Sequence, residues 1–308
     1  MNEQAAVAVP ATGSDPNRDL FARETAIESL TRRVVRRYVR HRLAMAGLAV
    51  FLVIALLAIF APVISQSDPD AVDLLARNQG PTWDHWFGTD RTGRDTFARV
   101  VYAGRVSLAV GVVAVAISVA VAVVLGATAG YFGGRVDNVI MRLTDVMMTF
   151  PPVVIILTVG AIAGPGVRNT MLVIGFLNWP IPCRLVRAKF LAVREMEYIT
   201  AARSLGVPTN RIVRRHALPN TIDVMIVYSS LGVANAILLE AGMSFLGVGV
   251  QPPTPSWGNL LNVARNISVL EGYPWLWLPA GVAIVLTVLA VNFIGDGLRD
   301  ALDPRMKI

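Results

Sequence analysis

Apolar residues in this chain are concentrated in long uncharged segments, which alternate with shorter segments rich in arginine and aspartate. A helix needs about 20 apolar residues to cross the roughly 30 Å hydrocarbon core of a bilayer. Four segments exceed that length, and two weaker ones reach it only by including prolines or a glutamate. Pro151 and Pro152 are expected to interrupt the third segment, a break that is tolerated only where protein or water satisfies the freed backbone groups. Buried helices of soluble proteins rarely run so far without a charge. We therefore predict an all-α membrane protein with six transmembrane helices, at about 43–65, 106–130, 139–163, 169–189, 222–246 and 275–297.

The first 42 residues are polar and lack the apolar segment and cleavage site of a signal peptide. Residues 1–18 are predicted to form a disordered cytoplasmic tail. Between 19 and 42, apolar residues recur every three or four positions from Ile27 to Tyr38, beside several arginines. This pattern predicts a basic amphipathic helix that lies on anionic membrane lipid. Nucleic acid is the alternative target, but a transmembrane segment follows at once, so we expect lipid and no nucleic acid as its partner.

The distribution of positive charge predicts the orientation. With both termini in the cytoplasm, the cytoplasmic segments hold 21 of the 28 Lys and Arg residues. This bias fits the positive-inside rule, and the opposite orientation would invert it. We expect a multi-pass protein of the cell inner (cytoplasmic) membrane, with a transmembrane domain over 43–308 and external loops at 66–105 and 247–274.

A polar helical hairpin is predicted at 195–219, between the fourth and fifth transmembrane helices. It contains Tyr198-Ile-Thr-Ala-Ala-Arg-Ser-Leu-Gly206, where good helix formers end at a glycine suited to a left-handed helix terminator. Pro208 suits the first turn of a second helix, which should run to about His216. Two adjacent alanines leave one face thin enough for a partner to approach closely. Two further glycines, Gly88 and Gly93, are predicted to form sharp turns in the first external loop.

The spacing of this hairpin is similar to the cytoplasmic EAA loop of ABC-importer permeases, which docks into the ATPase subunit. The residues that match the EAA pattern are Thr200, Ala201, Ala202, Arg203, Gly206, Leu218 and Pro219. Thr200 stands where many permeases have glutamate. Five further blocks resemble, in order, the C-type permease of dipeptide, oligopeptide and nickel ABC importers. They are Gly88-Thr-Asp-Arg-Thr-Gly-Arg-Asp95, Arg105-Val-Ser-Leu108, Ser244-Phe-Leu-Gly-Val-Gly-Val-Gln-Pro-Pro253, Pro255-Ser-Trp-Gly258 and Gly295-Asp-Gly-Leu-Arg-Asp-Ala-Leu-Asp-Pro304.

This resemblance covers roughly residues 35–305 and implies a type I ABC importer permease fold with the hairpin as its coupling element. It also implies three kinds of partner: a homologous B-type permease in a heterodimer, one or two ABC ATPase subunits, and an external substrate-binding protein. ATP and Mg would be bound by the ATPase subunits. We expect no cofactor in this chain, because neither Lys189 nor Lys307 lies in a phosphate-binding loop. We also expect no metal site, because Cys183 is the single cysteine and the three histidines lie far apart.

Ionisable residues inside a membrane are functional candidates. Glu240 lies 17 residues after Asp223, which is about 26 Å along a helix, so we expect it near the outer surface. Glu240, Gln251 and Trp257 are predicted to form an outer gate or a contact with the binding protein. A structural carboxylate at the outer rim is an equally good interpretation of Glu240. No charge is expected at the middle of the membrane, which argues against a proton relay.

We predict a transport subunit rather than an enzyme, translocating short peptides delivered by an external binding protein. A path lined by small uncharged residues suits a hydrated zwitterionic peptide, whereas a bare metal ion would prefer carboxylate, imidazole or water ligands. Nickel or another small solute remains the alternative, and a secondary transporter is a more distant one. An intramembrane protease is disfavoured because Asp296 lacks a Gly-x-Gly sequence before it and no histidine lies mid-span.

Overall fold

The computed structural model describes residues 30–65 and 67–302, which are mostly helical and contain no named strand. The predicted tail, the residues of the basic helix before Leu30 and the last six residues lie outside this part. The principal helices are α2 (Leu30–Arg40), α3 (Arg42–Ile59), α4 (Ala61–Ile64), α5 (Thr96–Phe132), α6 (Gly134–Thr149), α7 (Pro152–Ala163), α8 (Val167–Leu177), α9 (Pro180–Arg194), α10 (Glu197–Ser204), α11 (Thr209–Ile212), α12 (Ile222–Phe245), α13 (Trp257–Leu261), α14 (Ile267–Gly272) and α15 (Leu278–Leu302).

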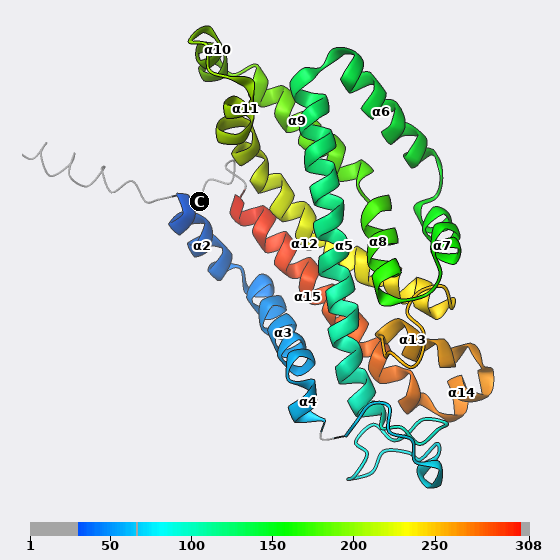
Figure 1. The fold of residues 1–308 in the computed structure, drawn as a ribbon. Helices are drawn as coiled ribbons and strands as arrows, with labels where there is room; N and C mark the ends of the chain where they lie inside the picture. Colours follow the sequence, from blue (N-terminus) through cyan, green and yellow to red (C-terminus); the bar gives the residue numbers. More distant parts are fainter. Residues whose placement is uncertain (1–29, 66, 303–308) are drawn as a thin grey trace, which may run out of the picture.

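The long helices form a tilted bundle around α5, with α10 and α11 at one end and α13, α14 and the segment 67–95 at the other (Figure 1). We call these the hairpin end and the loop end. Among the described helices, four are long and apolar enough to cross a membrane, and α6 with α7 would form a fifth crossing if counted as one. The protein is therefore a multi-pass helical membrane protein, while the count of six remains a prediction.

Small residues let α5 pack closely against its neighbours. A Cβ atom on Gly126 would lie 2.6 Å from the carbonyl oxygen of Cys183, and one on Gly130 would lie 2.6 Å from the Cβ of Phe190. Gly111 similarly faces Ile237 of α12. Such small-residue contacts are the usual way in which membrane helices approach, because lipid provides no hydrophobic driving force between them. The face of α3 that is turned away from the bundle exposes large apolar side chains, as a lipid-facing surface would.

One helix begins well before the sequence expectation. Helix α5 begins at Thr96, ten residues before the predicted span, so part of the predicted external loop is helical. Its start is set by Asp95, whose side chain accepts a hydrogen bond from the backbone N–H of Ala98 at 2.8 Å. Arg99 and Arg105 interrupt the apolar run here, which is why hydropathy alone missed this turn.

The remaining differences are breaks at prolines. The axes of α6 and α7 form an angle of 90° at Pro151 and Pro152, at the interruption that the sequence predicted. The predicted fourth span is divided into α8 and α9, and Pro180 is the first residue of α9. Proline lacks a backbone N–H and cannot continue a helix without distortion. Gly88 and Gly93 have φ angles of 65° and 78°, as their predicted sharp turns require.

Candidate functional site

The first helix of the 195–219 hairpin ends as its sequence predicted. Gly206 has φ 75°. Its N–H bonds to the carbonyl of Arg203 at 2.9 Å, and the N–H of Val207 bonds to that of Ala202 at 3.1 Å. These two bonds define a Schellman motif, which satisfies carbonyl groups at the end of α10 and fixes the direction of the chain beyond it.

The second arm of the hairpin departs from the predicted regular helix. It is α-helical only over α11, then continues as a π-helix at Val213–Ala217 and a 3-10 helix at Leu218–Thr221 that leads directly into α12. Pro219 lacks an N–H for a regular helical bond, and an irregular turn accommodates it. The second arm is consequently a continuous extension of α12.

The hairpin is fixed to the bundle by apolar and polar contacts. Ile199 and Ile212, one from each arm, are buried in a cluster with Phe190 of α9. The guanidinium of Arg203 lies 5.4 Å from the centre of the Tyr131 ring at the end of α5. The Tyr131 hydroxyl also lies 3.3 Å from the Thr209 hydroxyl. Movement of the hairpin would therefore act on α5, α9 and α12 together.

The predicted coupling residues divide by exposure. Thr200, Ala201, Arg203, Gly206 and Pro219 are exposed, whereas Ala202 and Leu218 are partly buried and pack within the hairpin. The sequence analysis missed Leu205, which is 83% exposed at the tip beside Gly206. The sequence feature that could have identified Leu205 is an apolar residue directly before a helix-terminating glycine in a polar segment. Leu205 adds an apolar side chain to the exposed coupling residues at this tip.

Glu240 lies inside the loop end of the bundle and is completely buried. Its two carboxyl oxygens accept hydrogen bonds from the hydroxyls of Ser107 at 2.9 Å and Ser244 at 2.7 Å. Each serine in turn accepts a backbone N–H, from Trp257 at 3.1 Å and from Val250 at 2.9 Å respectively. One carboxyl thus orients two hydroxyls that hold both ends of the 250–257 segment against α5 and α12.

Trp257 and Gln251 differ in their exposure. The Trp257 side chain is 2% exposed, and its indole N–H donates to the carbonyl of Val100 at 3.0 Å. A direct contact between this side chain and a binding protein is incompatible with this conformation, because α5 and α12 cover it. Gln251 is exposed and remains a candidate for such a contact.

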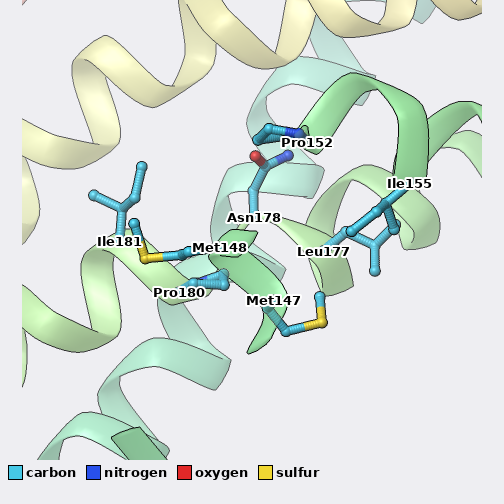
Figure 2. Close-up of a pocket in the computed structure, with 8 residues that line it drawn as sticks. All are labelled: Met147, Met148, Pro152, Ile155, Leu177, Asn178, Pro180 and Ile181. Atoms are coloured by element: carbon cyan, nitrogen blue, oxygen red, sulfur yellow. The ribbon is translucent and has the colours of Figure 1, made fainter. Parts of the chain in front are cut away.

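Figure 2 shows a pocket of about 90 Å³ where the two helix breaks meet, lined by the ends of α6 and α8 and the starts of α7 and α9. Asn178 is its polar side chain. A smaller adjoining pocket adds Ser118, Tyr228 and Asn235. The Ser118 hydroxyl is buried and has no hydrogen-bond partner among the described residues. These uncharged polar groups were missed because the sequence analysis sought only charges within the membrane.

A bundle of apolar helices with proline breaks, a rigid polar hairpin at one end and a pinned loop at the other defines a polytopic membrane protein of the transporter class. Residues 122–308 match the family model described as the binding-protein-dependent transport system inner membrane component. Residues 29–81 match the N-terminal transmembrane domain of oligopeptide transport permease C. The chain belongs to this permease family of ABC importers, whose members are transport subunits.

Individual relatives support the same assignment. The chain is 47% identical over 276 residues to a protein of Brucella suis biovar 1 (strain 1330) provisionally named a peptide permease, covering 90% of this chain and 91% of that protein. It is 42% identical to the dipeptide transport system permease protein DppC of Alkalihalophilus pseudofirmus, over 97% and 96% of the two chains. The glutathione transport system permease protein GsiD of Pectobacterium atrosepticum is 39% identical, over 92% and 94%.

Proposed function

We propose that this chain forms one half of the translocation path of an ATP-driven importer, paired with a homologous B-type permease. Its substrate would be a short peptide delivered by an external binding protein. The names of the relatives, which refer to peptide, dipeptide and glutathione transport, support this substrate class. Nickel or another small solute is the alternative substrate, and the growth assay described below distinguishes it from a short peptide.

The observation that carries the proposal is the geometry of the hairpin. Its exposed tip, from Thr200 to Gly206, is rigid because the Schellman motif fixes it. Its second arm is continuous with α12. We infer that this tip docks into one ATPase subunit and that ATP-driven movement of that subunit is transmitted through α12 to the path. ATP and Mg would bind the ATPase subunits, one or two in number.

The proposed orientation has both termini and the hairpin end in the cytoplasm and the loop end outside. The excess of Lys and Arg on the predicted cytoplasmic segments supports it. The Glu240 cluster would then close the path on the outer side, because it holds the 250–257 segment across α5 and α12.

Thiol labelling tests this orientation. In a Cys183→Ala background, Thr254→Cys should react with an impermeant maleimide added to intact cells, and Asn210→Cys should not. Both positions are exposed. Ser256, in the same predicted external loop, is buried and therefore unsuitable for the outer probe. Labelling of Asn210→Cys from outside would contradict the orientation.

A growth assay tests the substrate. A strain that is auxotrophic for an amino acid and lacks this permease should fail to grow on a short peptide containing that amino acid, yet grow on the free amino acid. Expression of the wild-type chain should restore growth on the peptide. Unimpaired growth of the deletion strain on the peptide, together with loss of nickel-dependent enzyme activity, would favour the alternative.

A further inference from the structure

A third pocket, of about 280 Å³, lies at the loop end of α5. Its lining includes Arg91, Arg94 and Arg99 together with the apolar residues Leu260, Val263 and Leu276, which we call its apolar wall. Its volume is close to the lower end of the range for small-molecule sites, about 300–1,000 Å³. A lining that combines cationic and apolar side chains suits a small amphiphilic anion.

Arg99 is the group that gives this pocket a specific chemistry. The residue is 3% exposed. Its Nη1 donates to the carbonyl of Pro69 at 3.2 Å and to a carboxyl oxygen of Asp70 at 3.4 Å. Its Nε is buried without a hydrogen-bond partner, and its hydrogen bonds to the described residues both come from Nη1. Nε and Nη2 form one edge of the guanidinium, an edge that binds a carboxylate through two parallel hydrogen bonds.

The acidic residue in the pocket is already engaged. Asp90 accepts hydrogen bonds from the backbone and hydroxyl of Thr92, from the backbone of Arg94 and from Arg94 Nε at 2.8 Å. Burial raises the pKa of Asp90, but these hydrogen bonds outweigh it and hold the pKa below its ordinary value. Asp90 is therefore an ionised partner of Arg94. The counter-ion of Arg99 is Asp70, 3.4 Å from Nη1, so the Nε–Nη2 edge has no acidic partner among the described residues.

We propose that this pocket binds the α-carboxylate of a peptide through the Nε–Nη2 edge of Arg99, with the side chain of the C-terminal residue against the apolar wall. The inference rests on the proposed function and names a contact of the substrate at the outer opening of the path. Pro252, inside the segment held by the Glu240 cluster, and Asn259, two residues beyond it, also line the pocket. The pocket therefore adjoins the proposed outer closure.

Peptide binding to the purified transporter complex tests this site directly. The complex is isolated through a tag on this chain, without the binding protein, and titrated with trialanine and with trialanine amide, which lacks the carboxylate. The wild-type complex should bind the free acid at least tenfold more tightly. Arg99→Gln should reduce this preference to less than twofold, and Arg99→Lys should retain part of it. Arg105→Gln is the matched control, because Arg105 is exposed on the same helix and stacks only on Tyr102.

A purely structural role for Arg99, holding residues 69–70, predicts a different result. Arg99→Gln would then lower the melting temperature but leave the preference for the free acid unchanged, and this outcome would overturn the proposal. If Arg99→Gln fails to fold, Val263→Phe tests the site from the apolar wall while leaving Arg99 in place. Val263 is partly exposed and lines the pocket. This variant should weaken trialanine binding at least fivefold, and unchanged binding would contradict the site.

The carboxylate that binds Arg99 could belong to the peptide or to an acidic side chain of the binding protein. Docking of the peptide-free binding protein to the complex distinguishes these two sources, and we expect it to be unchanged in Arg99→Gln. Weakened docking with an intact preference for the free acid would assign Arg99 to an acidic side chain of that protein and overturn the proposal. Because the titration needs neither ATP nor uptake, absence of ATP-driven peptide uptake would contradict the proposed function while leaving this binding difference measurable.

Discussion

Replacement of Glu240 is the most informative perturbation of the loop end. Glu240→Ala removes two accepted hydrogen bonds and leaves the hydroxyls of Ser107 and Ser244 buried without an acceptor. A buried unsatisfied polar group costs about 1–3 kcal/mol. We expect local opening of the 250–257 segment to become easier by about 3 kcal/mol. Glu240→Gln keeps one acceptor oxygen and should cost about 1 kcal/mol.

Thiol labelling of a buried position measures this opening. Val250 is 1% exposed, so a cysteine placed there in a Cys183→Ala background reacts only when the segment opens. At about 1.36 kcal/mol per factor of ten, Glu240→Ala should raise the labelling rate roughly 150-fold and Glu240→Gln roughly fivefold. Thr254→Cys, which is exposed, is the control and should label at the same rate in all three backgrounds. A change of less than twofold at Val250→Cys in Glu240→Ala would refute the claim that this carboxyl holds the segment.

Three further predictions concern the hairpin and the first external loop. Gly206→Val places a β-branched residue at φ 75°, which costs about 1–2 kcal/mol, and should reduce uptake while the chain still reaches the membrane; normal uptake would contradict its role in coupling. Leu205→Asp, at an 83% exposed position, should change the free energy of unfolding by less than about 0.5 kcal/mol but reduce co-purification of the ATPase. The control Asn210→Asp should reduce neither the stability nor the co-purification. Because the pKa of Asp90 lies below its ordinary 3.8, its stabilising effect is complete above that pH and is lost as pH falls through the lowered pKa. Proteolysis of the 67–95 segment should therefore accelerate below pH 3.8 in the wild type, and Asp90→Asn should remove this pH dependence; an equally strong acceleration in the variant would exclude Asp90.

Features that depend on local backbone chemistry were predictable from the sequence. Gly206, Gly88 and Gly93 adopt positive φ angles as expected, because only glycine enters that region without steric cost. The break at Pro151 and Pro152 follows from the missing N–H groups in the same way. Each of these predictions required only neighbouring residues.

Features that depend on distant partners were not predictable. The hydrogen bonding of Glu240 depends on Ser107, which lies 133 residues away in sequence. Trp257 was predicted to form an outer gate or a contact with the binding protein, and the burial of its indole N–H against the carbonyl of Val100, 157 residues away, was not foreseen. Helix α5 begins before Arg99 because Pro69 and Asp70 provide partners for its charge. Hydropathy and spacing contain no information about such contacts.

The central claim is ATP-driven import through a path coupled at the hairpin, and uptake into proteoliposomes tests it most directly. The complete transporter is reconstituted with ATP and Mg inside or outside, and with the binding protein and radiolabelled trialanine outside. The account predicts accumulation when ATP is inside, on the same side as the hairpin, and its loss in Leu205→Asp transporters. Accumulation without ATP, driven by an imposed proton gradient, would contradict it.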